Sequence, residues 1–496
     1  MAEPISVAQD SPGRLMRVVA RNSAFVLGSQ IAIKALAFLF NVFVVRRLGD
    51  VHFGQYSAVI AYIQMFSIFS DLGMAPYVLR EIARDRDRVY DLLPNLVTLR
   101  LILSSLVVAG VTAGVYLLGK GPEIVLGVLI AGLSLFIYSF QGPFEAILTA
   151  WERLDLTARY TILNQLVFWS AGTALLLMGC GYIGLLAAML LGITIMALVS
   201  GRTVLQQIEV GRLKVDRSRW WPLLMAGLPF GISGISFVLE TRFDVSFMSF
   251  ILPDAAVGWY AVACNLSVMA YPIAMSVCSS IYPTLVREHA LGVNPIEPVI
   301  AKTMKYLLMV SLPIAVGGTL VSDKLIRFLY TDQFAAAGPV FALVIWDLPA
   351  FFITELTGPT CLILQLEKKV ARVNMSNAII HVILDLALIP PFGIMGAAVA
   401  EVFARWLRVF LHWRLLGVNR LTNGRWLPLA RVALSALGMG AVVFLVRHLH
   451  LFATIGIGAA AYLVLLLATQ AVEPQELRQI IRMVSMRGSD KMSASQ

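Results

Sequence analysis

Three charged residues, Glu240, Arg242 and Asp244, lie within five positions of the segment ETRFDVSFM (240–248), and the residues on both sides are apolar. In a helix, positions four apart share a face, so Glu240 and Asp244 point the same way, while Arg242 lies roughly 200° around the axis. Arg242 therefore cannot pair readily with either carboxylate. Two carboxylates on one face repel each other, and they need a cation from another helix or a shared proton. The segment predicts a polar site that other helices must complete.

The composition around this segment is that of a membrane protein. Of the 496 residues, 59% are hydrophobic and 14% are charged, and the mean hydropathy is +0.81. Soluble domains are about half apolar and a quarter charged, whereas a membrane-spanning helix needs ~20 mostly apolar residues. We therefore predict an all-α polytopic membrane protein with about fourteen transmembrane helices, at roughly 23–45, 54–78, 93–118, 124–147, 160–179, 182–200, 223–250, 257–284, 302–322, 338–362, 371–390, 394–415, 428–447 and 451–470.

The basic residues indicate how the chain is oriented. Most lysines and arginines of the connections fall in the N-terminal segment, the even-numbered connections and the C-terminal tail, and the odd-numbered connections hold only Arg46, Arg47, Lys120, Lys324, Arg327 and Arg447. Because basic residues are enriched on the cytoplasmic side, both termini are predicted to be cytoplasmic. This topology accounts for the net charge of +10, so a nucleic-acid partner is not expected. Residues 1–22 lack a cleavable signal pattern, and the first span is expected to act as an uncleaved anchor.

The chain also carries an internal repeat. Gly54 and Tyr56 at the start of span two match Gly258 and Tyr260 of span eight, 204 positions later, and these spans end in the similar segments PYVLRE (76–81) and PTLVRE (283–288). Further matches at offsets of 212 or 213 pair Arg159, Asn164, Gly181 and Gly184 with Arg372, Asn377, Gly393 and Gly396. A displacement by six spans, an even number, predicts two lobes in one orientation, related by a pseudo-two-fold axis along the membrane normal. Transporters with this design bind substrate between their halves.

The expected organisation follows from the spans and the repeat. It comprises a cytoplasmic N-terminal segment (1–22), an N-lobe of spans one to six (23–200), a cytoplasmic linker (201–222), a C-lobe of spans seven to twelve (223–416), two extra spans (428–470) and a cytoplasmic tail (471–496).

Charged residues inside the spans are the candidates for function, because a charge at the membrane centre costs at least about 2.5–3.5 kcal/mol. The residues predicted to line a substrate cavity are Lys34, Arg100, Glu240, Arg242 and Asp244. Our hypothesis is that Lys34 of span one faces the Glu240/Asp244 side of span seven across the interface between the lobes. Glu355 and Asp385 are candidates to bind a coupling proton or sodium ion. The structural alternative is that such pairs only hold helices together, and that Arg100 is an anchor near the cytoplasmic face.

Motifs for enzyme chemistry are absent from the sequence. There is no Walker-type Gly-x-x-x-x-Gly-Lys-Ser/Thr, no His-Glu-x-x-His and no Cys-x-x-Cys. The four cysteines, Cys180, Cys264, Cys278 and Cys361, are scattered and are expected to be packing residues. We therefore predict no enzyme activity, no cofactor and no metal site.

Three segments resemble a known family. NSAFVLGSQIAIKALAFLFNVFVVRRLGDVHFGQYSAVIAYIQMFSIFSDLGMAPYVLREIAR (22–84) resembles the opening of bacterial polysaccharide flippases of the multidrug/oligosaccharidyl-lipid/polysaccharide exporter superfamily. AAVGWYAVACNLSVMAYPIAMSVCSSIYPTLVRE (255–288) resembles the start of their second half, and residues 312–346 resemble the connection between their spans nine and ten. The resemblance covers roughly residues 20–420.

The resemblance implies a function in a bacterial cytoplasmic (inner) membrane. Members move an undecaprenyl-pyrophosphate-linked oligosaccharide repeat unit from the inner to the outer leaflet by alternating access between two six-helix lobes. Expected partners are that substrate, membrane lipids, a coupling proton or sodium ion, and polysaccharide polymerase or assembly proteins. Lipid II flippases carry an arginine-rich first span, whereas here only Lys34 lies in its interior. This difference favours an exopolysaccharide, an O-antigen or a similar surface glycan, including lipopolysaccharide, over a peptidoglycan precursor.

Three alternatives stay open. A cation-coupled multidrug or toxin exporter of the same superfamily would use an acidic cavity, typically with twelve spans. A polysaccharide polymerase or ligase would need a large outer loop, which the chain lacks. A scaffold of a glycan-assembly complex would need no transport activity.

Overall fold

The structure is a computed structural model, and it describes residues 12–291, 296–417 and 426–471. The first eleven residues of the predicted N-terminal segment and the tail from residue 472 onward lie outside the described residues. Within the described ranges the chain is helical and contains no strand, which confirms the predicted fold class.

The helices of the first half are α1 (Pro12–Asp71), α2 (Met74–Arg84), α3 (Val89–Leu117), α4 (Pro122–Ala150), α5 (Leu154–Leu177) and α6 (Gly181–Leu205). Those of the second half are α7 (Trp220–Ile251), α8 (Asp254–Ser267), α9 (Tyr271–Leu291), α10 (Glu297–Tyr330), α11 (Ala337–Val344), α12 (Asp347–Ile363), α13 (Glu367–Phe392) and α14 (Ile394–Leu416). The last two are α16 (Leu427–Leu445) and α17 (Leu451–Ala468). Short 3₁₀ turns lie at Arg86–Arg88, Val210–Arg212, Arg217–Arg219, Val268–Ala270 and Asp332–Phe334.

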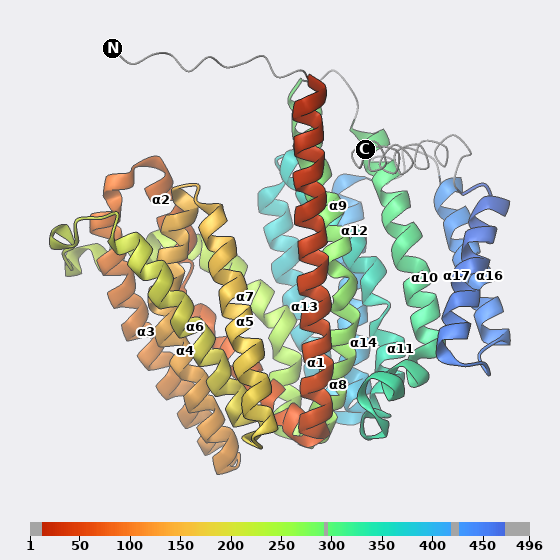
Figure 1. Ribbon diagram of the computed structural model, residues 1–496, viewed down its shortest axis with the longest axis horizontal. Coiled ribbons are helices and arrows are strands. Elements are labelled where there is room, and N and C mark those ends of the chain that lie inside the picture. Colours follow the sequence, from red (N-terminus) through yellow and green to blue (C-terminus); the bar gives the residue numbers. More distant parts are fainter. Residues whose placement is uncertain (1–11, 292–295, 418–425, 472–496) are drawn as a thin grey trace, which may run out of the picture.

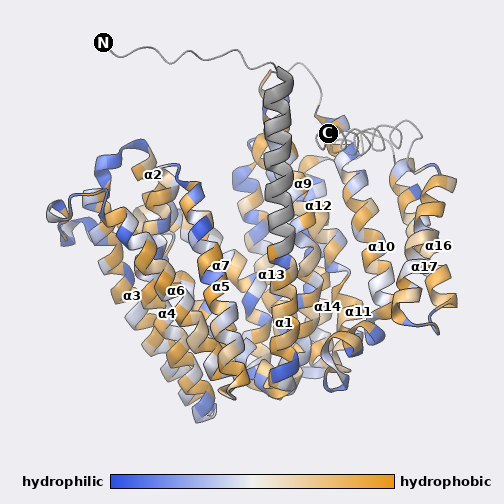
Figure 2. Cartoon of the chain, viewed as in Figure 1, coloured by the Kyte–Doolittle hydropathy of each residue, from blue (hydrophilic) through white to orange (hydrophobic). Residues whose placement is uncertain are grey.

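Each predicted span falls on a helix or on a pair of consecutive helices. By length and apolar character, 10 helices of the described ranges can cross a membrane, or up to 12 when two bent pairs are counted. α14 is not among them, because it carries several charged residues. α14 nevertheless follows α13 and precedes α16 in the chain, so the chain must cross the bundle again along α14. Figure 2 shows the corresponding pattern, with apolar residues along the middle of the helices and hydrophilic residues gathered at both ends.

Gly49 divides α1 into the first two predicted spans. A straight helix of 60 residues would be about 90 Å long, three times the hydrocarbon core of a bilayer. The chain therefore breaks at Gly49, where φ is 73° and ψ is 177°, a conformation that a residue with a Cβ rarely adopts. The two parts of α1 thus form two separate spans.

The helices form two groups that lie side by side (Figure 1). α2 to α6 lie together at one side of the view, and α8 to α14 lie at the other, with α1 between them. The α16–α17 pair packs on the outside of α10, through Val432, Met439 and Val443 on α16 and Val321 on α10. The two extra spans are therefore an addition to the rim of the second lobe.

Matching positions of the repeat have matching backbones. Gly181 is the first residue of α6 and Gly393 is the residue directly before α14, the second helices of two hairpins, and their φ angles are 57° and 59°. Both glycines were paired in the sequence, and both occupy the left-handed region that favours glycine. The repeated glycines therefore mark the same tight turn in each lobe.

The start of α7 is fastened to the first lobe. The side-chain oxygen of Asn95 on α3 accepts from the backbone N–H of Asp216 at 2.9 Å and from Trp220 Nε1 at 3.1 Å. In the same connection, the hydroxyl and backbone N–H of Ser218 bind Asp216 and lower the pKa of its carboxyl group. α7 then bends by 55° near Gly234, and its second part packs against α13 and α1. This second part carries Glu240, Arg242 and Asp244.

Candidate functional site

The charged segment of α7 lines a cavity of about 630 Å³ inside the second lobe. Glu240 and Asp244 are buried, with 5% and 6% of their surface exposed, and Arg242 also lines the cavity. α8 and the turn after it, α9, α11, α12, α13 and α14 contribute the remaining walls. Phe243 and Phe247 lie elsewhere on α7 and line an apolar groove of about 700 Å³ against α1 and α3. α7 therefore separates a polar cavity from an apolar groove.

α14 brings a row of polar side chains to this cavity. Glu401, Arg405, Arg408 and His412 follow at spacings of four, three and four residues, which places all of them on one helix face. All four line the cavity. The rest of this face is small and apolar, with Ala397, Ala400 and Ala404 buried. This face of α14 is thus the charged wall of the site.

Two arginines of α14 pair with carboxylates of α7 and α12, and these carboxylates also accept from α13 and α9. Arg408 forms an ion pair with Glu240 of α7, and Glu240 also accepts from Asn377 Nδ2 on α13 at 3.1 Å. Arg405 Nε lies 3.0 Å from Asp347 Oδ1 on α12 and 3.0 Å from Glu401 Oε1. Tyr271 of α9 donates to the second oxygen of Asp347.

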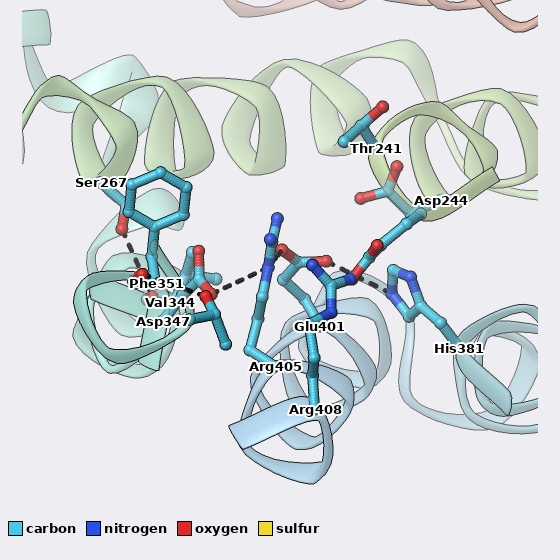
Figure 3. A network of polar contacts seen from close by, with 12 residues as sticks. Thr241, Asp244, Ser267, Val344, Asp347, Phe351, His381, Glu401, Arg405 and Arg408 are labelled. Carbon is cyan, nitrogen blue, oxygen red and sulfur yellow. Dashed lines mark hydrogen bonds and ion pairs between the residues drawn. The ribbon is translucent and has the colours of Figure 1, made fainter. Parts of the chain in front are cut away.

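A buried histidine continues the network toward α7 (Figure 3). His381 on α13 has no exposed surface, and its Nε2 lies 3.4 Å from Glu401 Oε2 and 3.6 Å from Asp385 Oδ2. Asp385 is also fully buried, and its two oxygens have no hydrogen-bond partner among the described residues. Asp244 accepts from Tyr260 of α8 at 2.6 Å. His381 therefore lies where acidic groups of α13 and α14 meet.

The cluster holds more acidic than basic groups. Its buried carboxyl groups are those of Glu240, Asp244, Asp347, Asp385 and Glu401, and the arginines paired with them are Arg405 and Arg408. A carboxylate without a counter-charge is unfavourable in a low-dielectric interior, so such a cluster retains protons or takes up a cation. No group of three or more His, Cys, Asp or Glu side chains in the described part of the chain could hold a metal ion. The arrangement is thus chemically suited to exchanging protons.

A second cavity adjoins the polar one. It has a volume of about 550 Å³ and is lined mainly by apolar residues of α10, α11, α16 and α17, together with the end of α8 and the turn after it. Ser267 of α8 lines both this cavity and the polar cavity. Ser267 therefore lies in the wall between an apolar space and a charged space.

A comparison with protein families gives the context for this geometry. A family described as "Polysaccharide biosynthesis protein" matches residues 19–289, more than half of the chain. The chain belongs to the polysaccharide biosynthesis protein family.

Two curated relatives of this family member come from Haloferax volcanii. The chain is 22% identical over 479 residues to a probable low-salt glycan biosynthesis flippase, Agl15, covering 94% of this chain and 99% of that protein. It is 21% identical to a probable flippase, AglR, covering 81% of this chain and 84% of that protein.

Solved structures show the same fold. The lipid II flippase MurJ in an inward closed conformation aligns with a TM-score of 0.69 at 16% identity, over 88% of this chain and 98% of that one. An inward-facing multidrug resistance transporter of the MATE family aligns with a TM-score of 0.57 at 16% identity, over 78% and 96%. Together with the family match, these results confirm the resemblance to polysaccharide flippases of the multidrug/oligosaccharidyl-lipid/polysaccharide superfamily. The protein is therefore a multi-pass membrane transporter of polysaccharide biosynthesis.

The residues singled out in the sequence lie in three places in this family member. Glu240, Arg242, Asp244 and Glu355 line the polar cavity, and Asp385 lies beside it through His381. Lys34 is exposed on α1, and in the described part of the chain it forms no ion pair with Glu240, which instead pairs with Arg408.

Arg100 lies in the first lobe, away from the residues that line the polar cavity. It is buried on α3, where its NH1 group lies 3.6 Å from Asp71 Oδ1. The structure thus brings together the α7 residues and Glu355 but places Lys34 and Arg100 elsewhere. The assignment of all five residues to a substrate cavity stays a prediction.

The sequence reasoning missed Arg405 and Arg408, the cations that pair with the α7 and α12 carboxylates. Their signal is present in the sequence, because Glu401, Arg405, Arg408 and His412 repeat at helical spacing inside an apolar span. His381 and Asp385, four positions apart on α13, give a second such signal. Two neighbouring spans with polar faces would have indicated a site between them.

Proposed function

We propose that the protein translocates an undecaprenyl-pyrophosphate-linked oligosaccharide repeat unit from the inner to the outer leaflet of a bacterial cytoplasmic membrane. Movement occurs by alternating access between the N-lobe (23–200) and the C-lobe (223–416), with both termini in the cytoplasm. The family match and the two flippase relatives support this class of substrate. The substrate glycan is an exopolysaccharide, an O-antigen or a similar surface polymer.

The single observation that carries the proposal is the charged cavity within an otherwise apolar bundle. A sugar–pyrophosphate head is polar and anionic, so it needs a polar space with an available cation. Arg242 meets that need, because it lines the cavity and has no ion-pair partner among the described residues. Arg405 and Arg408 are already paired with carboxylates, so they set the shape of the cavity and Arg242 binds the pyrophosphate.

The lipid part of the substrate needs an apolar surface next to the head. The cavity of about 550 Å³ between α10, α11, α16 and α17 supplies one, and it shares the lining residue Ser267 with the polar cavity. In this arrangement the sugar lies among the charged side chains while part of the polyprenyl chain lies against the two extra helices.

The acidic excess of the cluster supports coupling to a cation gradient. We assign the coupling proton to the His381–Asp385–Glu401 group, because His381 Nε2 lies within 3.6 Å of a carboxylate oxygen of both Asp385 and Glu401, and all three side chains are buried. Asp385 was a candidate from the sequence, and Glu355, the second candidate, lies on the wall of the same cavity.

The experiment that tests the proposal measures lipid-linked oligosaccharide on each leaflet. Depletion of the protein is expected to cause cytoplasm-facing accumulation, detected by its resistance to an external lectin or glycosidase. Arg242→Met should lower translocation about tenfold or more, because a charge-assisted hydrogen bond contributes about 1.5–3 kcal/mol and 1.4 kcal/mol is a factor of ten. Arg242→Lys should retain part of the activity. Arg447→Met, an exposed arginine that lies over Phe444 away from the cavity, is the matched control.

The second candidate is a cation-coupled exporter of cationic compounds, and the excess of carboxyl groups in the cavity favours it. Cells lacking the protein would then keep normal lipid-linked sugar pools and lose resistance to cationic dyes. That result would replace the flippase proposal.

A further inference from the structure

The two halves of the chain contact each other where α1 turns at Gly49 and α8 begins. At the lower end of Figure 1 these two segments lie side by side. The first contributes Asp50, Gly54 and Gln55, and the second contributes Asp254, Gly258 and Trp259. Each residue of the second set lies 204 positions after its counterpart, the offset of the Gly-x-Tyr repeat. We call these six residues the reciprocal contact.

The two glycines of the reciprocal contact bring the backbones together. A Cβ added to Gly54 would overlap the carbonyl oxygen of Asp254 and lie 3.0 Å from the backbone nitrogen of Gly258. A Cβ added to Gly258 would overlap the carbonyl oxygen of Asp50 and lie 3.2 Å from the backbone nitrogen of Gly54. Each half therefore contacts the other through the same backbone atoms, and glycine is required at both positions.

The side chains repeat the same exchange. Gln55 Nε2 donates to Asp254 Oδ2 at 3.0 Å, and Trp259 Nε1 donates to Asp50 Oδ2 at 3.2 Å while it also lies 3.0 Å from the carbonyl oxygen of Gln333. Gln55 and Trp259 are repeat counterparts, and so are the two aspartates. His52 Nδ1 lies 3.1 Å from Gln55 Oε1 and orients the amide so that its nitrogen points toward Asp254.

Further bonds fasten the same end of the molecule. Arg46 donates to the carbonyl oxygens of Leu329 and Phe328, each at 2.5 Å, at the C-terminus of α10. These carbonyls lack partners within their own helix and carry partial negative charge, so a cation satisfies them. Lys120 donates to the carbonyl oxygen of Ser249, and the hydroxyl of Ser249 shares a hydrogen bond with the hydroxyl of Tyr62. The contact between the halves is thus continuous from α1 to α7, α8 and α10.

We propose that the reciprocal contact is the outer gate of the transporter, which separates when the cavity opens to the outside. The inference rests on the proposed function, because alternating access requires the halves to part at each end in turn. With both termini cytoplasmic, this end faces outward. The four polar side chains of the contact are only partly buried, so water can replace their partners as the halves part. Opening therefore leaves no buried charge without a partner. In the closed state, the two glycines allow the close contact between the backbones.

The test measures access to the cavity from outside. Cys180, Cys264, Cys278 and Cys361 are replaced by serine, and Gly358→Cys supplies a single reporter. Gly358 lines the cavity, and an added Cβ there meets no atom within 4 Å. In intact cells, Gly54→Ala and Gly258→Ala should raise the rate of labelling by a membrane-impermeant maleimide several-fold, because the added methyl groups prevent closure. Gly110→Ala is the matched control, since its added Cβ also meets no atom within 4 Å, and it should leave the rate unchanged.

A second variant keeps the test decisive if the alanine variants fail to reach the membrane. Gln55→Ala combined with Trp259→Phe removes both donors without adding volume, and it should also accelerate labelling. Rates equal to those of Gly110→Ala in every variant that reaches the membrane would overturn the gate. The labelling assay needs no glycan, so faster labelling without any effect on lipid-linked sugar would retain the gate and overturn the proposed substrate.

Discussion

Glu240 on α7 and Arg408 on α14 form an ion pair inside the second lobe. Glu240 is 5% exposed, and its other partner is the neutral amide of Asn377. The pair therefore joins two residues that are 168 positions apart in the sequence, at the wall of the cavity.

Removing one member of this pair should destabilise the protein more than removing both. Arg408→Ala leaves Glu240 buried without a counter-charge, and we expect a loss of about 3–5 kcal/mol in the free energy of unfolding. Glu240→Gln combined with Arg408→Met should recover most of this loss. The measurement is thermal unfolding in detergent, with the exposed Arg414→Ala on the same helix as control. Equal melting temperatures for Arg408→Ala and Arg414→Ala would show that the ion pair does not contribute to the stability of the fold.

The substitution Asp385→Asn tests whether Asp385 or Glu355 is the ion-coupling residue. Because Asp385 is fully buried and its oxygens lack hydrogen bonds, an amide of the same shape should not lower the melting temperature. Transport should, however, become independent of an imposed proton gradient. Glu355→Gln, on the partly exposed wall of the cavity, should keep that dependence. The reverse pattern would move the coupling site to Glu355.

Gly142→Ala should destabilise the first lobe through Arg100. A Cβ at Gly142 would lie 2.5 Å from Arg100 NH1, so the guanidinium must leave its position near Asp71. Overpacking of this kind costs about 1–3 kcal/mol. Gly114→Ala, where an added Cβ meets no atom within 4 Å, is the control for helical glycine in the same lobe. Unfolding temperatures of the two variants that differ by less than the error of the measurement would contradict the buried position of Arg100.

Cys180 tests the orientation of the chain in the membrane. It is exposed at the connection between α5 and α6, which faces outward if both termini are cytoplasmic. A membrane-impermeant maleimide should label it in intact cells, and Cys180→Ser should remove most of that signal, because Cys278 and Cys361 are buried and Cys264 is only partly exposed. Labelling that requires permeabilised cells would invert the proposed topology.

The helices and the repeat could be predicted because their signals are local. Apolar runs of membrane length give the spans, and a glycine at a tight turn, such as Gly181 or Gly393, gives the same signal in both halves. The bend in α7 and the attachment of its first part to Asn95 could not be predicted, since they depend on which helices become neighbours.

The candidate site was predicted in part for the same reason. Glu240, Arg242 and Asp244 are conspicuous because they interrupt an apolar run, and they do share one cavity. Their partners were sought on α1, at Lys34, because the repeat relates span one to span seven. Symmetry relates equivalent positions, but it does not say which helices touch. Arg408 is near Glu240 because α7 and α14 both pack against α13.

The reciprocal contact around Gly54 and Gly258 has the form of an interface between two copies of one protein. In an isologous dimer, residue i of each chain meets residue j of the other, so every contact occurs twice. An ancestral six-helix chain with one aspartate, one glycine and one donor at these positions would have formed the whole contact by pairing with itself. Gene duplication and fusion would then have freed the two donors to diverge, one to glutamine and one to tryptophan, while both glycines stayed where the backbones meet.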